Sequence, residues 1–171
     1  MNQMATSSLS ALVHALDDAV QAPPGTRAAA AAAAMAPFLA RPDLLERHPC
    51  PCSTERYMRH ALHCDPKGRY CLVAIVWRPG QESPIHAHKT WCAFGVHQGA
   101  VVESFFAVPD AENPELTDAV LRRARATSHG EASPHAAHRV ANPGEKTAVT
   151  LHVYGVAYDD YGEGVSRILA A

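Results

Sequence analysis

After residue 51 the sequence changes from helical periodicity to a series of short strand-like segments, and this change constrains the fold more than any other feature. The segments are rich in β-branched and aromatic residues, and clusters of Pro, Gly, Asp and Asn separate them. Short strands at this spacing, with no helical pattern between them, predict an all-β barrel or sandwich. The expected strands are residues 56–63, 69–77, 91–98, 101–108, 119–126, 139–142 and 147–154.

The first 50 residues have a different character. Between residues 7 and 20, apolar side chains recur at steps of three and four, which predicts an amphipathic helix. A Pro-Pro-Gly sequence then ends this helix, and Thr26 is placed to cap a second, alanine-rich helix from residue 27 to about 39. We therefore expect a single domain, with a helical N-terminal extension over residues 1–50 and the barrel over residues 51–171.

Composition and charge narrow the class of protein. With 47% apolar and 19% charged residues the chain can bury a core, which argues against disorder. A formal net charge of -2 without any basic run argues against nucleic acid as a partner. Residues 27–40 are mostly alanine and fall short of the roughly 20 residues of a membrane span, and residues 1–10 lack the features of a secretory signal. The five cysteines have no framework spacing. We expect a soluble, cytoplasmic protein with no membrane partner, and the sequence gives no indication of its oligomeric state.

Histidine is the unusual residue type, with eleven copies in the chain. In a strand, His86 and His88 point to the same face, close enough to hold one metal ion. Imidazole suits zinc, iron, copper and nickel. Two solvated histidines at the end of a strand would produce the same short pattern, so other residues have to decide.

Two further groups lie downstream. His138 stands where a separate strand begins, and a third imidazole there would complete a facial set of ligands, with His135 as the alternative. Period-two alternation places Thr150, His152 and Tyr154 on one face of a later strand and apolar residues on the other. We interpret this polar row as a hydrogen-bonded relay that ends in a phenol, unless that face meets solvent.

Several short motifs follow one another with strand spacing between them. In order they are Pro79-Gly80-Gln81, Ser83-Pro84-Ile85-His86-Ala87-His88, Trp91, Gly95-Val96, Gly99, His138-Arg139-Val140-Ala141-Asn142 and Leu151-His152-Val153-Tyr154-Gly155. This series resembles the bacterial cysteine dioxygenase family, a group of cupin-fold thiol dioxygenases. The resemblance covers roughly residues 57–154, extends more weakly to Arg167, and leaves residues 1–50 unexplained. It implies that the barrel is a cupin double-stranded β-helix.

The resemblance also implies a site for non-haem Fe(II) and O2. His86, His88 and His138 look like the three neutral iron ligands of the family, and no carboxylate follows His88 where most cupins place one. An all-histidine site leaves the full +2 charge on the metal, which favours binding of an anionic thiolate.

Other residues match the part of the family site that surrounds the metal. His152 and Tyr154 look like its outer-sphere pair, and Thr150 stands where the family usually has serine. Tyr57-Met58-Arg59 resembles a Y-x-R strand of the family, in which Tyr57 and Arg59 share a face. Arg59 would clamp the substrate carboxylate through two charge-assisted hydrogen bonds, unless it is a surface arginine.

The position of the clamp bears on the choice of substrate but does not decide it. Arg167 is the second candidate, because some relatives that prefer 3-mercaptopropionate carry glutamine where Arg59 stands here and use a later arginine. Arginine at position 59 favours L-cysteine, which the family's reaction with O2 converts to its sulfinic acid. The alternatives are a dioxygenase of 3-mercaptopropionate or another thiol acid, and a metal-binding cupin that acts as an isomerase, hydrolase or sensor.

Three positions depart from the family pattern or stay open. Ala87 replaces the aspartate of the usual H-D-H sequence, which removes a carboxylate that could orient a ligating histidine. Cys92 resembles the cysteine that forms a thioether with the active-site tyrosine in mammalian-type enzymes, although it follows His88 one residue sooner; a small buried side chain is the alternative. Glu103 is the nearest carboxylate, and we expect it to be a solvated strand residue.

Overall fold

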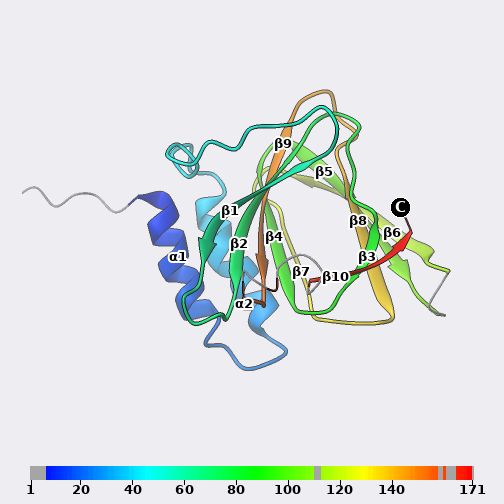
Figure 1. Ribbon diagram of the computed structural model, residues 1–171, viewed down its shortest axis with the longest axis horizontal. Helices are drawn as coiled ribbons and strands as arrows, with labels where there is room; N and C mark the ends of the chain where they lie inside the picture. Colours follow the sequence, from blue (N-terminus) through cyan, green and yellow to red (C-terminus); the bar gives the residue numbers. More distant parts are fainter. Residues whose placement is uncertain (1–6, 110–112, 158–159, 161–164, 171) are drawn as a thin grey trace, which may run out of the picture.

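The computed structural model describes residues 7–109, 113–157, 160 and 165–170, so the outermost residues of the expected extension and barrel, 1–6 and 171, lie outside it. Within the described residues, two helices and a short 3-10 turn precede ten strands (Figure 1). The elements are α1 (Ser8–Ala19), α2 (Arg27–Met35), η1 (Ala36–Phe38), β1 (Met58–Cys64), β2 (Cys71–Trp77), β3 (Ile85–His88), β4 (Cys92–Gln98), β5 (Ala100–Ala107), β6 (Glu115–Arg123), β7 (Thr127–Gly130), β8 (Ala136–Ala141), β9 (Ala148–Tyr154) and β10 (Ser166–Ala170).

The strands form two five-stranded antiparallel sheets. The first sheet has the order β1-β2-β9-β4-β7 and the second the order β10-β3-β8-β5-β6. The two sheets lie on either side of a common interior, with the helices beside the first sheet (Figure 1). The prediction of an all-β fold preceded by helices is therefore confirmed. Three of the ten strands are absent from the seven expected segments. These are β3, which was considered as a strand only for the pattern of His86 and His88, and β7 and β10; they have four, four and five residues, too few for alternation to be recognised.

The first sheet is covered on both faces. Leu12, Leu16 and Met35 of the two helices pack against one face of it, together with Leu72 and Leu151 from β2 and β9. The other face lines the interior between the sheets. Because both of their faces are covered, every residue of β2 and of β9 is buried.

Polar contacts fix the first helix to the sheet. The Ser7 side chain caps α1 by accepting a hydrogen bond from the backbone N–H of Ser10 at 3.2 Å. Near its other end, Asp17 pairs with Arg69, and Arg69 also binds Asp65 in the turn between β1 and β2, with an Nε to Oδ2 distance of 2.7 Å. The N-terminal helices are thus part of the packed structure that supports the barrel.

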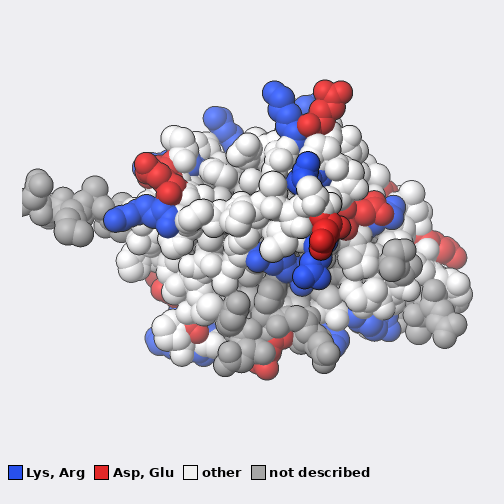
Figure 2. Space-filling model, turned by 45° about the horizontal axis from the view of Figure 1, so that its top comes forward, with Lys and Arg blue, Asp and Glu red and all other residues white. Residues whose placement is uncertain are grey.

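All five cysteines are unpaired. Neither helix in the described part of the chain has the length and apolar character needed to cross a membrane. On the face shown in Figure 2, basic and acidic side chains lie beside one another without forming a large patch of one sign.

Candidate functional site

Three histidine side chains converge between β3 and β8. His86 and His138 are direct partners in the antiparallel pairing of these strands, and His88 lies two residues further along β3, on the same face. Nε2 of His138 lies 2.9 Å from Nε2 of His88 and 3.2 Å from Nε2 of His86. The candidate ligand atoms all lie within 4.8 Å of one another, which is the spacing that a single metal ion requires.

The protonation of these rings fits a cation between them. Nδ1 of His86 lies 2.9 Å from the carbonyl oxygen of Pro84, and Nδ1 of His138 lies 3.0 Å from Oε1 of Glu103. Each oxygen acceptor requires a proton on Nδ1, so in the neutral form of either ring Nε2 carries no proton and its lone pair faces the cluster. Burial lowers the pKa of His86 to about 4 and that of His88 to about 2, which keeps both rings neutral. Converging lone pairs repel without a cation, and three imidazoles suit a divalent transition metal.

Glu103 on β5 supplies the carboxylate that orients His138. The residue is 2% exposed, and its second oxygen, Oε2, accepts a hydrogen bond from Nε of Arg122 at 2.8 Å. Burial alone would raise the pKa of Glu103, but the hydrogen bond from His138 and the charge of Arg122 lower it, so the carboxylate is ionised. The expectation of a solvated Glu103 was wrong. The signal for burial is alternation, because Val101, two residues earlier on the same strand face, is fully buried.

Ala87 and Arg167 lie on the opposite side of the second sheet. Ala87 packs with Phe106 and Ala137, away from the three imidazoles. Arg167 is its direct partner on β10, and its Nη2 donates a hydrogen bond to the carbonyl of Pro134 at 3.0 Å. The structure therefore does not bring Arg167 to the histidine cluster, and the carboxylate that contacts a histidine of the cluster, Glu103, comes from another strand.

The polar row on β9 forms the expected chain of contacts. Thr150 Oγ1 lies 2.8 Å from Nε2 of His152, and Nδ1 of the same ring lies 3.2 Å from the Tyr154 hydroxyl. All three side chains are buried and point into the interior between the sheets. Burial holds the pKa of His152 well below its ordinary value, so this ring is neutral. The chain extends one residue further than the sequence indicated, because Nε1 of Trp77 donates to Thr150 Oγ1 at 2.8 Å.

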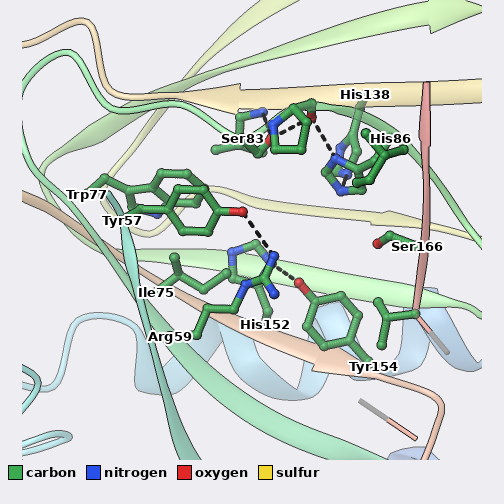
Figure 3. Close-up of a pocket in the computed structure, with 14 residues that line it drawn as sticks. Tyr57, Arg59, Ile75, Trp77, Ser83, His86, His138, His152, Tyr154 and Ser166 are labelled. Atoms are coloured by element: carbon green, nitrogen blue, oxygen red, sulfur yellow. Dashed lines mark hydrogen bonds between the residues drawn. The ribbon is translucent and has the colours of Figure 1, made fainter. Parts of the chain in front are cut away.

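A cavity of about 250 Å³ joins the relay to the histidine cluster. Tyr57 and Arg59 line it on one side and His86 and His138 on the other, and Tyr154 also lines it, beside His152 (Figure 3). His88 faces a second cavity of about 100 Å³, which also reaches His86 and His138.

The arginine in the first cavity is held in place by aromatic rings. Nη2 of Arg59 donates a hydrogen bond to the Tyr57 hydroxyl at 2.9 Å, and its guanidinium carbon lies 5.3 Å from the centre of that ring. The Tyr57 ring stacks on Trp77 with a centroid distance of 4.6 Å. Tyr57 and Arg59 thus share a face, and that face turns toward the candidate metal site (Figure 3).

Cys92 lies beside the phenol of the relay. Cys92 on β4 and Tyr154 on β9 are direct cross-strand partners, and both belong to the same buried cluster. Cys71 occupies the equivalent position on the other flank of Tyr154. Burial raises the pKa of the Cys92 thiol well above its ordinary value. The pair is placed as neighbours, as a thioether would require, and formation of that bond stays a prediction. His135, the alternative ligand, is exposed and directly precedes β8.

Taken together, these groups can hold one transition metal, one small anion and one proton donor in a common space. The three imidazoles would hold a metal ion and leave coordination positions for other ligands. A guanidinium on the opposite wall suits a carboxylate. The buried phenol of Tyr154 lines the same cavity and can donate a hydrogen bond to a ligand bound there.

Comparison with known proteins agrees with this arrangement. A sequence model of the family described as Cysteine dioxygenase type I matches residues 3–162. Human "Cysteine dioxygenase type 1" is 30% identical over 109 residues, which are 61% of this chain and 53% of the human protein. The cattle protein of the same name is 29% identical over the same length. The chain spans about half the length of the curated relatives it matches.

Solved structures identify the fold. A Klebsiella pneumoniae protein described as having a double-stranded β-helix domain matches with a TM-score of 0.54 and 15% identity, over 74% of this chain and 95% of that one. Oxalate decarboxylase from Bacillus subtilis matches with the same TM-score and 17% identity, over 74% of this chain and 31% of the decarboxylase. The expected cupin double-stranded β-helix is thereby confirmed. Since the family model covers nearly the whole chain, this protein belongs to the cysteine dioxygenase type I family.

Proposed function

We propose that this protein is a thiol dioxygenase that uses Fe(II) and O2 to convert L-cysteine into its sulfinic acid. Both atoms of O2 add to sulfur, so that one thiol and one O2 give one sulfinic acid and the reaction needs no other reductant. The observation that carries the proposal is the common cavity of about 250 Å³, which Arg59 lines together with His86 and His138.

The metal site and the arginine bind the two ends of one small substrate. His86, His88 and His138 would hold Fe(II), and bound Fe(II) would supply the electron that activates O2 and the positive charge that favours a thiolate. Arg59 would bind the substrate carboxylate, because its planar guanidinium matches a carboxylate through two parallel hydrogen bonds. The hydrogen bond to Tyr57 orients that guanidinium before the substrate arrives.

Tyr154 and His152 act on the oxygen side of the reaction. Both line the cavity, and the His152 ring contacts the Tyr154 hydroxyl at 3.2 Å. Tyr154 would donate a hydrogen bond to the oxygen that adds to sulfur, and Thr150 would hold the His152 ring that orients it.

The placement of the two arginines favours L-cysteine over 3-mercaptopropionate. Arg59 lines the cavity, whereas Arg167 binds the Pro134 carbonyl on the opposite side of the second sheet. The clamp therefore belongs to the type that the resemblance associates with cysteine. We further propose that the protein acts in the cytoplasm, where reducing conditions suit five unpaired cysteines.

Oxygen uptake by the purified, Fe(II)-loaded protein tests the function directly. L-Cysteine and 3-mercaptopropionate are supplied in parallel, and the sulfinic acids are quantified. We expect uptake matched by sulfinate, faster with L-cysteine. Uptake without sulfinate, or turnover that proceeds without O2, would contradict the proposal. Preference for 3-mercaptopropionate would retain the reaction class and overturn the assigned substrate.

Single substitutions test the ligand set. His86→Ala, His88→Ala and His138→Ala should each abolish Fe(II) binding and turnover, because two imidazoles cannot complete the site. His135→Ala is the matched control, since this exposed ring lies outside the cluster, and it should bind iron normally. A fully active variant at any of the first three positions would remove that residue from the ligand set.

A further inference from the structure

Trp77 makes two contacts that no other side chain in the described part of the cavity combines. The face of its ring stacks on Tyr57, which in turn binds Arg59. The edge of the same ring donates its Nε1–H to Thr150 Oγ1 at 2.8 Å. Trp77 is 1% exposed, so neither contact competes with bulk water.

The indole fixes the direction of the hydrogen bonds that follow. Indole nitrogen is a donor only, so the Thr150 oxygen accepts from it. The described structure gives the Thr150 hydroxyl one other partner, Nε2 of His152 at 2.8 Å, and the hydroxyl proton goes there. Nε2 of His152 is therefore an acceptor and carries no proton.

The tautomer of His152 follows from this assignment. A neutral imidazole carries one proton, which must lie on Nδ1 when Nε2 accepts a hydrogen bond. Nδ1–H then donates to the hydroxyl oxygen of Tyr154 at 3.2 Å. The phenol proton is not used in the contact with His152, and it can be directed into the cavity that Tyr154 lines.

The opposite direction would leave a buried group unsatisfied. If Nε2 carried the proton, Thr150 would accept from both Trp77 and His152, and its own hydroxyl proton would have no acceptor in the described structure. Thr150 is fully buried, so water could not compensate without a rearrangement. Tyr154 would then donate to Nδ1, which turns its proton away from the cavity.

We propose that Trp77 is a positioning residue, whose indole N–H sets the Nδ1–H tautomer of His152 and so directs the Tyr154 phenol proton toward the substrate. The kinetic consequence rests on the proposed dioxygenase function, whereas the tautomer does not. The same indole holds Tyr57 through ring stacking, so it joins the carboxylate clamp to the proton donor.

Nitrogen NMR of the histidine rings tests the assignment without turnover. The full chain, labelled with 15N-histidine and loaded with diamagnetic Zn(II), is compared with its Trp77→Phe variant, and the signal of His152 is identified by its absence from His152→Gln. We expect wild-type His152 to show a protonated Nδ1 and a bare Nε2. A protonated Nε2 in the wild-type protein would overturn the proposal, whether or not any variant folds.

Three variants separate the hydrogen bond from the bulk of the ring. Trp77→Phe keeps a ring against Tyr57 but removes the N–H, so we expect His152 to show a mixture of tautomers. Thr150→Ser keeps the hydroxyl and should preserve the wild-type pattern. Trp91→Phe is the matched control, because it changes the chain's other tryptophan, which lies outside the relay, and it should also preserve the pattern. An unchanged His152 pattern in a folded Trp77→Phe variant would refute the role of the indole.

Kinetics of the Fe(II)-loaded variants show whether the tautomer matters. With L-cysteine as substrate, we expect Trp77→Phe to lower kcat about tenfold and to leave KM within about twofold of the wild-type value. The loss in kcat is smaller than the 10²–10⁴-fold that a group transferring the proton itself typically contributes, because Trp77 acts through His152. A change in KM alone would indicate that Trp77 acts only through Tyr57 and the clamp, and would overturn the proposal. Absence of sulfinate from the wild-type protein would instead count against the dioxygenase function and leave the NMR result intact.

Discussion

Replacing Glu103 by Gln should weaken metal binding although Glu103 touches no metal position. The carboxylate accepts from Nδ1 of His138 at 3.0 Å and from Nε of Arg122 at 2.8 Å. An amide of the same shape has one oxygen and one NH2 group. Whichever way it turns, one of the two donors loses its acceptor and meets another donor.

The size of the effect follows from these two contacts. Loss of the partner that orients a ligating histidine typically costs 10–100-fold in metal affinity, or about 1.4–2.8 kcal/mol. The metal-free protein should also lose stability, because the Arg122 side chain is only 22% exposed and would lack its charged partner. A buried donor left without an acceptor costs about 1–3 kcal/mol.

Anaerobic competition with a chromophoric Fe(II) chelator measures the affinity, and urea denaturation of the metal-free protein measures the stability. The matched control is Glu82→Gln, which removes a carboxylate from a pair with Arg139 whose side chains are 49% and 35% exposed. Exposed pairs contribute about 0–1 kcal/mol, so this control should bind Fe(II) like the wild-type protein. If Glu103→Gln binds Fe(II) within about twofold of the wild type, the orienting role of Glu103 is refuted.

Three further predictions concern the clamp, the phenol and acid stability. Arg59→Ala should raise KM for L-cysteine by about 10–100-fold, because it removes a bidentate charged contact of roughly 1.5–3 kcal/mol. Arg167 lies outside the cavity, so Arg167→Ala should leave the steady-state kinetics unchanged. Equal effects of the two substitutions would contradict the assignment of Arg59 as the clamp. Tyr154→Phe should lower kcat or uncouple O2 uptake from sulfinate with iron content retained, and loss of iron there would refute an outer-sphere role. Burial lowers the pKa of His86 to about 4 and of His88 to about 2, so the unfolded chain, with histidine pKa near 6.5, binds more protons below that pH. The free energy of unfolding of the metal-free protein, measured by urea denaturation, should therefore fall as the pH decreases from about 6.5 toward 4. The decrease should be up to about 1.4 kcal/mol per pH unit for each histidine. A free energy of unfolding that rises over this range would contradict neutral, buried rings of His86 and His88.

Local sequence patterns predicted the site wherever one strand carries the relevant residues. His86 and His88, two positions apart, share a face of β3, and the same alternation places Thr150, His152 and Tyr154 in one inward row on β9. That these residues share a face follows from strand geometry alone, whereas the inward direction of that face depends on the packing of the two sheets, which the sequence pattern left open.

Contacts between distant strands could not be derived in this way. Trp77 reaches Thr150 because β2 and β9 pair, although 73 residues separate the two side chains. Glu103 reaches His138 because β5 and β8 pair. A tryptophan in a strand buried on both faces still requires an acceptor for its N–H, and this requirement was the available signal for Trp77.

The misjudgement of Glu103 has a physical cause that also explains its importance. A carboxylate in a strand is normally placed on the solvent side, because burying a charge is costly unless it is paired and hydrogen-bonded. Glu103 meets that condition through His138 and Arg122, and the cost of burial is offset by those contacts. Similarly, Thr150 and His152 stand in a strand whose other residues, apart from Tyr154, are apolar, and each is satisfied by a neighbour in the relay. Among the buried polar residues of the strands, Glu103 contacts a histidine of the candidate metal site and His152 lines the adjoining cavity, which is where a departure from simple packing is expected to serve function.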